Sequence, residues 1–219
     1  MSEEERKRNG AFMSQLPPEL ERKKLFKRDG SSFSPEDLKG KLIGYYFGAH
    51  WCDHCRAFTP KLKEFYEAVY PTGQFEIVWA PYDKVEKEML DYMSDAHGNW
   101  LRLPFKDALI GTLARKWHLN SIPNLVVVAP NGTTISTNGR WDIEGRAPLD
   151  VLHGWLKKAG MEYVIIKTTH PDGTVSMERK LVNKMNKGMV KNIIKDHFAG
   201  MTANPSGGST TTRMPPVSI

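Results

Sequence analysis

The chain has 219 residues, of which 40% are apolar, and its formal net charge is +6. This length accommodates one domain of about 150 residues with an extension, and the apolar fraction suffices for a packed core. Two cysteines are too few for the disulfide scaffold of a small secreted protein. No stretch approaches the ~20 consecutive apolar residues that would span a membrane. Residues 1–8 lack the apolar run of a signal peptide, so we expect a cytoplasmic protein that is also found in the nucleus.

Short elements are predicted before the first long apolar run. Residues 1–20 are polar and then broken by prolines, which predicts an N-terminal arm, either loose or forming a short helix. Leu25 and Phe26 lie in a basic setting and predict a short first strand. Ser34 followed by Pro35 is typical of the start of a short helix.

The longest signals alternate between strand and helix patterns. Residues 42–47 are nearly all apolar, as in a strand buried on both faces. The helix that follows the cysteines repeats apolar residues with a period near 3.6. Its apolar positions are Phe58, Leu62, Phe65, Tyr66 and Val69.

The pattern continues to residue 158 and predicts one α/β domain. The remaining expected elements are a strand at 75–82, a helix over 85–92, a helix over 109–117, a strand at 125–128, a hairpin strand at 133–136 and a helix over 150–158. The order β-α-β-α-β-α-β-β-α predicts a mixed central sheet with helices on both faces, over residues 21–159.

Residues 160–219 form a basic extension. They contain eight Lys or Arg against four Asp or Glu, so they carry +4 of the net charge of +6. Residues 160–200 form the part of this extension in which structure is expected. Residues 163–166 predict an extra strand, and residues 178–198 predict a basic amphipathic helix. We expect this helix to pack on the sheet domain or on a second copy of the chain, although an acidic partner or a membrane surface is an alternative. Residues 201–219 are rich in Ser, Thr, Gly and Pro, which predicts a disordered tail.

Both cysteines lie in the motif Trp51-Cys52-Asp53-His54-Cys55, between the strand at 42–47 and the helix that follows. Two thiols at this spacing can close into a disulfide. The start of a helix also favours a thiolate, because free backbone N–H groups and the helix dipole stabilise negative charge there. The motif therefore predicts a redox-active dithiol.

The motif and its surroundings resemble the tryparedoxin/nucleoredoxin branch of the thioredoxin-like proteins. The resemblance covers roughly residues 20–158. It is carried by Gly40-Lys41-Leu42, Tyr46-Phe47, Ala49, Trp51-Cys52, Cys55-Arg56, Phe58-Thr59-Pro60, Phe65-Tyr66, Phe75-Glu76-Ile77-Val78, Leu103-Pro104-Phe105 and Ser121-Ile122-Pro123. It implies a thioredoxin-like fold.

The resemblance also implies a role for each residue of the site. Cys52 is the expected nucleophile, and Cys55 is the buried thiol that resolves the mixed disulfide. Pro123 is expected in the cis form, exposing the backbone of Ile122 for strand-like pairing with a substrate. Trp51 is expected to shield Cys52 and to contact partners, although it could serve packing alone.

The activity implied is thiol–disulfide exchange without a bound cofactor. The expected substrates are protein or peroxiredoxin disulfides, and the electrons would come from a low-molecular-weight thiol such as glutathione or from a reductase. We expect a reduction potential between about −270 and −180 mV. No nucleic-acid partner is expected.

The chain departs from the family pattern around the cysteines. Asp53 and His54 stand where the branch typically carries two prolines: His54 favours a neighbouring thiolate, whereas Asp53 opposes it. Tyr46 and Trp79 occupy positions where thioredoxins keep a buried Asp–Lys pair. The branch lacks that pair too, so the general base is not identified from the sequence.

Three alternatives stand beside this interpretation. The cysteines with His50 and His54 are suitable metal ligands, but no second cysteine pair exists, so we expect no metal and an exposed loop position for His50. The domain could instead be a non-catalytic module that binds partners through its surface and basic extension. The basic cluster at residues 22–28 is interpreted as a charged sheet edge rather than a nucleic-acid contact.

Overall fold

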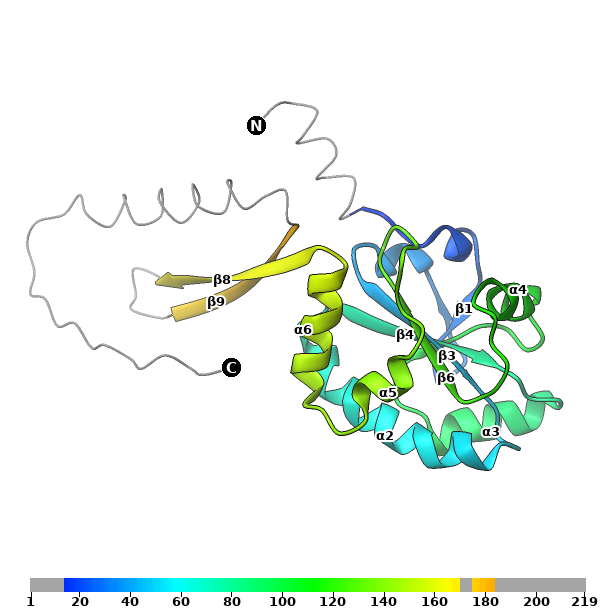
Figure 1. The fold of residues 1–219 in the computed structure, drawn as a ribbon. Coiled ribbons are helices and arrows are strands. Elements are labelled where there is room, and N and C mark those ends of the chain that lie inside the picture. The colour runs from blue at the N-terminus through cyan, green and yellow to red at the C-terminus, as the bar shows by residue number, and fades with distance from the viewer. Residues whose placement is uncertain (1–13, 170–174, 184–219) are drawn as a thin grey trace, which may run out of the picture. The chain divides into compact units, whose positions relative to one another are not determined.

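The computed structural model of the protein describes residues 14–169 and 175–183, and the chain divides into two compact units, residues 1–162 and 163–219. In the described part of the first unit, seven strands form one sheet with the order β2-β1-β5-β4-β3-β6-β7 (Figure 1). The strands are β1 (Leu25–Phe26), β2 (Ser32–Phe33), β3 (Leu42–Gly48), β4 (Phe75–Pro81), β5 (Leu101–Arg102), β6 (Asn124–Val128) and β7 (Thr134–Ser136). The helices are α2 (Asp53–Val69), α3 (Glu86–Ala96), α4 (Ala108–Lys116), α5 (Gly139–Ile143) and α6 (Pro148–Lys158), with 3-10 turns η1 (Pro18–Leu20), η2 (Pro35–Leu38) and η3 (Tyr70–Thr72).

Strand β3 lies at the centre of the sheet and leads into the cysteine motif. It pairs in parallel with β4 and antiparallel with β6, so the sheet is mixed, as predicted. All seven residues of β3 are buried. An apolar strand of this kind is expected where helices cover both faces of a sheet.

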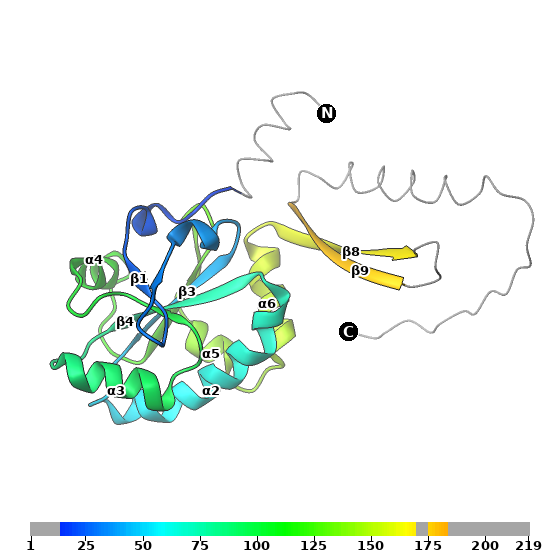
Figure 2. The ribbon, with the colours of Figure 1, turned by 180° about the vertical axis from the view of Figure 1, so that it is seen from behind.

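Each face of the sheet has its own core. Helix α4 and the segment before β1 cover one face, with Leu20, Leu25 and Leu113 in a single buried cluster. Helices α2, α3 and α6 cover the other face (Figures 1 and 2). There the ring centroid of Trp155 in α6 lies 5.4 Å from that of Phe65 in α2 and 5.6 Å from that of Phe75 in β4. The two layers hold the central strands rigidly, as close-packed interiors do.

The predicted thioredoxin-like architecture is confirmed, and every long element predicted between residues 21 and 159 is present. The elements missed are short, namely β2, β5 and α5. Two-residue strands carry no periodic signal, and their backbone pairing depends on neighbours that are distant in the chain. Strand β5, for example, exists because its residues pair with β4 on one side and β1 on the other.

Of the two forms expected for residues 1–20, a loose arm or a short helix, the structure shows the short helix in the part that it describes. Leu16 is only 7% exposed and Leu20 is fully buried, and residues 18–20 form the 3-10 turn η1. Both leucines join the core beneath α4. Burial of these two side chains outweighs the polar character of the segment. Residues 1–13 lie outside the described residues.

A two-stranded sheet pairs β8 (Met161–Thr169), which begins at the end of the first unit, with β9 (Val175–Asn183) of the second unit. The extra strand expected at residues 163–166 is confirmed as part of β8. The helix predicted from residue 178 is wrong for residues 178–183, which belong to β9. Pairing with β8 satisfies the backbone hydrogen bonds of this segment and overrides its helical pattern. Residues 184–198 of the predicted helix and the predicted disordered tail lie outside the described residues.

Candidate active site

The two cysteines lie where β3 ends and α2 begins. Cys52 is the N-cap of α2, and its Sγ accepts a hydrogen bond of 3.1 Å from the backbone N–H of Cys55. The first N–H groups of a helix have no partner within the helix, and the helix dipole adds partial positive charge there. The position therefore stabilises a negative charge on the Cys52 sulfur.

Both cysteines are free thiols, and they differ in burial. Cys52 is 8% exposed, whereas Cys55 is fully buried. Burial raises the pKa of the Cys55 thiol well above its usual range, and the hydrogen bond between the Cys55 and Cys52 side chains raises it further. Cys55 therefore keeps its proton in the dithiol form. Because Cys52 is slightly exposed and Cys55 is not, Cys52 is the more accessible sulfur and Cys55 the protected one.

The loop before β6 also lies close to Cys52. The Ile122–Pro123 peptide bond is cis, as predicted, and the Cys52 Sγ lies 3.8 Å from the carbonyl oxygen of Ile122, to which the thiol donates. A groove of about 260 Å³ runs beside this contact. It is lined by Phe47, Trp51, Tyr82, Leu119, Asn120, Ser121 and Ile122.

Trp51 forms an exposed wall of this groove. Its ring is 47% exposed, and its Nε1 donates a hydrogen bond of 3.1 Å to the carbonyl oxygen of Tyr82. The Lys84 ammonium lies 5.4 Å from the ring centroid, within cation–π range. About half of the Trp51 surface is therefore open to solvent beside the groove.

Arg56 changes the electrostatics of the pair between the cysteines. Its guanidinium forms an ion pair with Asp53 and donates a second hydrogen bond, of 2.5 Å, to the carbonyl oxygen of His50. Asp53 and His54 are both exposed. The Asp53 carboxylate, which the sequence predicts to oppose a thiolate, is thus paired with a cation on its own helix.

Tyr46 lies deeper than the cysteines and reaches them through Thr59. The Thr59 hydroxyl donates to the carbonyl oxygen of Cys55 at 2.9 Å. It also lies 2.8 Å from the Tyr46 hydroxyl and 2.7 Å from the Tyr92 hydroxyl. Since the single Thr59 hydrogen is used by Cys55, both tyrosines donate to Thr59. The network holds the first turn of α2 against β3 and α3.

His97 lies beneath this network in a cage of aromatic rings. Its side chain is fully buried, its ring centroid lies 4.2 Å from that of Trp79, and its Nδ1 accepts a hydrogen bond of 3.1 Å from Trp100 Nε1. Burial lowers the pKa of His97 to about 3. The ring is therefore neutral and structural at physiological pH.

Asp83 is the main residue of this region that the sequence interpretation missed. It follows β4 closely, its side chain is 5% exposed, and its Oδ1 accepts a hydrogen bond of 2.8 Å from the backbone N–H of His50. A signal for it exists in the sequence, because β3 and β4 are parallel and their carboxyl ends meet at one edge of the sheet. Arg56 was likewise detectable, since it lies three residues after Asp53 on a helix.

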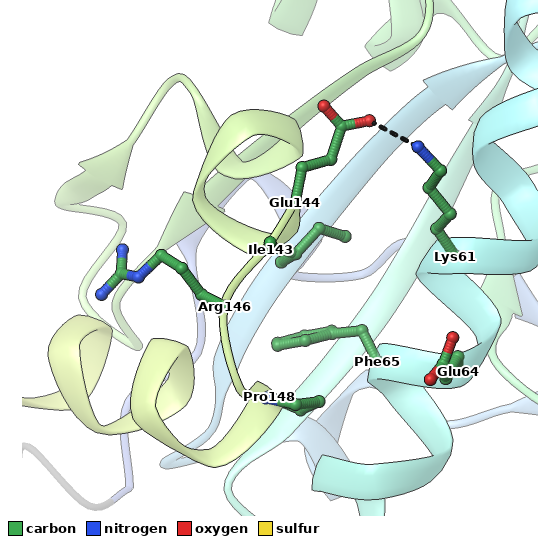
Figure 3. A pocket seen from close by; sticks show the side chains of 8 residues that line it. Lys61, Glu64, Phe65, Ile143, Glu144, Arg146 and Pro148 are labelled. Atoms are coloured by element: carbon green, nitrogen blue, oxygen red, sulfur yellow. Dashed lines mark hydrogen bonds and ion pairs between the residues drawn. The ribbon is translucent and has the colours of Figure 1, made fainter.

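A second hollow, of about 320 Å³, lies between α2 and the segment that joins α5 to α6 (Figure 3). Lys61 and Glu144 form an ion pair of 3.2 Å at its edge, and Phe65 and Pro148 form its apolar part. It contains none of the predicted site residues. Among the described residues there is no group of three or more His, Cys, Asp or Glu arranged to hold a metal ion, and no helix long and apolar enough to cross a membrane.

Known proteins are similar to the first unit both in sequence and in fold. Residues 40–134 match the family model described as thioredoxin-like. Probable nucleoredoxin 3 from Oryza sativa subsp. japonica is 36% identical over 137 residues, which are 61% of this chain and 28% of that protein. The chain thus spans less than a third of the length of this relative.

Solved structures extend the comparison to nearly whole proteins. Thioredoxin from Wuchereria bancrofti has 39% sequence identity and a TM-score of 0.54, with 66% of this chain and 96% of that chain covered. Tryparedoxin I from Leishmania major has 33% identity and a TM-score of 0.53, with 60% of this chain and 88% of that chain covered.

Proposed function

Because this chain belongs to the tryparedoxin/nucleoredoxin branch of the thioredoxin-like proteins, we propose that it is a thiol–disulfide oxidoreductase with a dithiol mechanism. The observation that supports this most directly is the position of Cys52. Its sulfur accepts the Cys55 N–H at the start of a 17-residue helix and lies 3.8 Å from the carbonyl oxygen of Ile122, a residue that lines an open groove. A sulfur held in this way is both stabilised as a thiolate and accessible to a substrate disulfide.

In the proposed mechanism, the Cys52 thiolate attacks one sulfur of the substrate disulfide and forms a mixed disulfide. Cys55 then attacks the Cys52 sulfur, which releases the substrate as a thiol and leaves a Cys52–Cys55 disulfide. Because Cys55 is buried, it is protected from competing reactions until the mixed disulfide has formed. A reducing partner restores the dithiol.

Ile122 and Trp51 are the proposed substrate contacts. An extended substrate chain that pairs with the backbone at Ile122 would bring its disulfide to Cys52, because the Ile122 carbonyl already lies 3.8 Å from that sulfur. Pro123 shapes this loop, and Trp51 offers an exposed apolar surface beside it. Main-chain pairing of this kind tolerates many substrate sequences.

The proposed substrates are protein or peroxiredoxin disulfides in the cytoplasm and nucleus. The proposed electron donor is a low-molecular-weight thiol such as glutathione, or a reductase. Equilibrium in a glutathione buffer is a suitable measure, since the expected potential of about −270 to −180 mV overlaps that of the glutathione pool.

The proposal is tested by redox titration of the full chain in glutathione buffers, together with insulin disulfide reduction. The wild-type protein should titrate reversibly with two electrons. Cys52→Ser should abolish turnover, and Cys55→Ser should accumulate the mixed disulfide. A dithiol that forms no disulfide, or that cycles without reducing insulin, would instead support the partner-binding module.

A further inference from the structure

The proposed mechanism needs a group that removes the proton from Cys55. The Cys55 thiol is fully buried, and its own pKa is raised by that burial, so the thiolate does not form readily without help. Resolution of the mixed disulfide nevertheless requires a Cys55 thiolate. Tyr46 and Trp79 occupy the positions expected for the buried acid–base pair of thioredoxins, and neither is an efficient base at neutral pH.

Asp83 is a buried carboxylate beside the dithiol. Its Oδ1 is held by the His50 N–H at 2.8 Å, two residues before Cys52. Its Oδ2 is also buried and has no hydrogen-bond partner among the residues that the structure describes. Buried carboxylate oxygens normally have partners, so a free oxygen next to a site of proton transfer calls for an explanation.

The surroundings of Asp83 connect it to Cys55. The residue before it, Tyr82, packs on the small cluster of Ala49, Cys52 and Cys55. Burial is the main cause of the raised pKa of Cys55 and of Tyr92, and the negative charge of Asp83 adds the smallest contribution in the same direction. Burial also raises the pKa of the Asp83 carboxyl, which brings it closer to neutral pH and makes it a better proton acceptor than an exposed aspartate.

The other titratable groups around Asp83 are less suited to act as a base. Glu88 on α3, Lys84 on the same loop and His50 are exposed. Tyr92 on α3 donates its hydroxyl to Thr59, and burial raises its pKa above the usual value. In the structure, Asp83 is thus the buried carboxylate whose charge acts on Cys55.

We propose that Asp83 is the general base that accepts the Cys55 proton when the mixed disulfide is resolved, an assignment that rests on the proposed oxidoreductase function. No hydrogen bond joins the two side chains directly in the described part of the chain, so the proposed proton transfer includes water between them. As the Cys55 sulfur loses its proton, it attacks the Cys52 sulfur. The Cys52–Cys55 bond forms, the bond between Cys52 and the substrate sulfur breaks, and the electron pair leaves on the substrate thiolate. Across both steps the substrate disulfide gains the two electrons that the dithiol loses, and Asp83 returns its proton to solvent.

The test follows both steps in one experiment. Reduced full-length protein is mixed with 5,5′-dithiobis(2-nitrobenzoate), and release of thionitrobenzoate is recorded by stopped flow. Attack by Cys52 releases the first thionitrobenzoate, and attack by Cys55 on the mixed disulfide releases the second. Asp83→Asn retains an oxygen that can accept the His50 N–H but cannot take up a proton. We expect the first phase to be unchanged within about twofold and the second to slow about 100-fold.

The pH profile separates a base from a merely structural residue. In the wild-type protein the second phase should become independent of pH above the pKa of Asp83. In Asp83→Asn it should instead rise about tenfold per pH unit, because hydroxide replaces the missing base. Glu88→Gln is the matched control, since it removes a nearby exposed carboxylate and leaves Asp83 in place. Its second phase should still reach a pH-independent plateau at the wild-type rate, although the plateau begins at a lower pH, because the Glu88 charge contributes to the raised pKa of Asp83.

The following outcomes decide whether Asp83 is the base. A second phase in Asp83→Asn with the wild-type rate and profile would falsify the assignment. If Asp83→Asn does not fold, the wild-type protein alone provides the test. A second-phase rate that rises tenfold per pH unit over the whole pH range overturns the assignment, and a rate that becomes independent of pH supports it. A wild-type protein whose first phase is absent, or survives in Cys52→Ser, removes the proposed function rather than the role of Asp83 alone.

Discussion

Arg56 and Thr59 show how single residues of α2 adapt the dithiol to its unusual central pair. Arg56 compensates Asp53 and ties the turn before Cys52 through the His50 carbonyl oxygen. Thr59 accepts from two buried tyrosine hydroxyls while it donates to Cys55. Both side chains act on the backbone and charge around the sulfurs rather than on the sulfurs themselves. Fully satisfied buried networks of this kind rigidify the elements that they join.

At the same scale, His97 should make the protein sensitive to acid. Its pKa is about 3 in the folded protein, below the ordinary value of 6.5 that it regains on unfolding. Between these values the unfolded chain binds a proton that the folded chain does not, so stability falls as the pH falls. From pH 6.5 to about pH 4 the loss should be on the order of 3 kcal/mol, and below about pH 3 His97 should cause no further loss.

Urea unfolding of His97→Asn at several pH values measures this contribution. The asparagine oxygen can still accept from Trp100, so the variant loses packing at every pH but should lack the acid-dependent part of the wild-type curve. His118→Asn replaces an exposed histidine and should keep the wild-type curve. Equal acid sensitivity in His97→Asn and wild-type protein would mean that the ring is protonated in its cage.

At the scale of elements, α5 shows what periodicity cannot predict. It is five residues long, and it packs on β6 through Gly139 at its first position. A Cβ atom at Gly139 would lie 2.7 Å from the backbone oxygen of Leu125, closer than real contacts allow. The glycine is thus required by close approach of two elements, a requirement that no local pattern in the sequence contains.

Two glycine substitutions should therefore have opposite effects on stability. Gly139→Ala should lower the free energy of unfolding by about 1–3 kcal/mol, because α5 must move away from a backbone atom. Gly154→Ala lies inside α6, where an added Cβ meets nothing within 4 Å, and should raise it by about 0.5–1 kcal/mol. Chemical denaturation of both variants gives the comparison. A destabilised Gly154→Ala, or an unchanged Gly139→Ala, would contradict this account of the packing.

At the scale of the whole molecule, the site belongs entirely to the first unit. The dithiol, the groove and the proposed base all lie between residues 46 and 123, within the unit that spans residues 1–162. The second unit, residues 163–219, contributes the β8–β9 pair from residue 163 onward, and residues 160–219 carry +4 of the net charge of +6. All the residues of the candidate site therefore come from one unit of the chain.

A chain of residues 1–162 should therefore fold and reduce insulin at a rate within about twofold of the full chain, because the first unit has a hydrophobic core of its own. Unfolding curves and turnover of the two chains provide the measurement. Cys52→Ser in the shortened chain is the control for background reduction. A folded but inactive short chain would show that residues 163–219 take part in catalysis or substrate binding.

The local sequence determined the elements whose signals are long and periodic, together with the positions of the cysteines. Strand β3, helix α2 and the Cys52–Cys55 pair were predicted because apolar period and motif spacing are properties of neighbouring residues. The family resemblance supplied Pro123 and its cis bond.

Tertiary structure decided what depends on approach between distant segments. Asp83 was placed beside the dithiol because β3 and β4 end at the same edge of the sheet, and Leu16 and Leu20 were buried because α4 covers them. Residues 178–183 became a strand because β8 offered a pairing partner. In each case the deciding free energy, from burial or from backbone pairing, arises between residues far apart in the chain, and local pattern does not contain it.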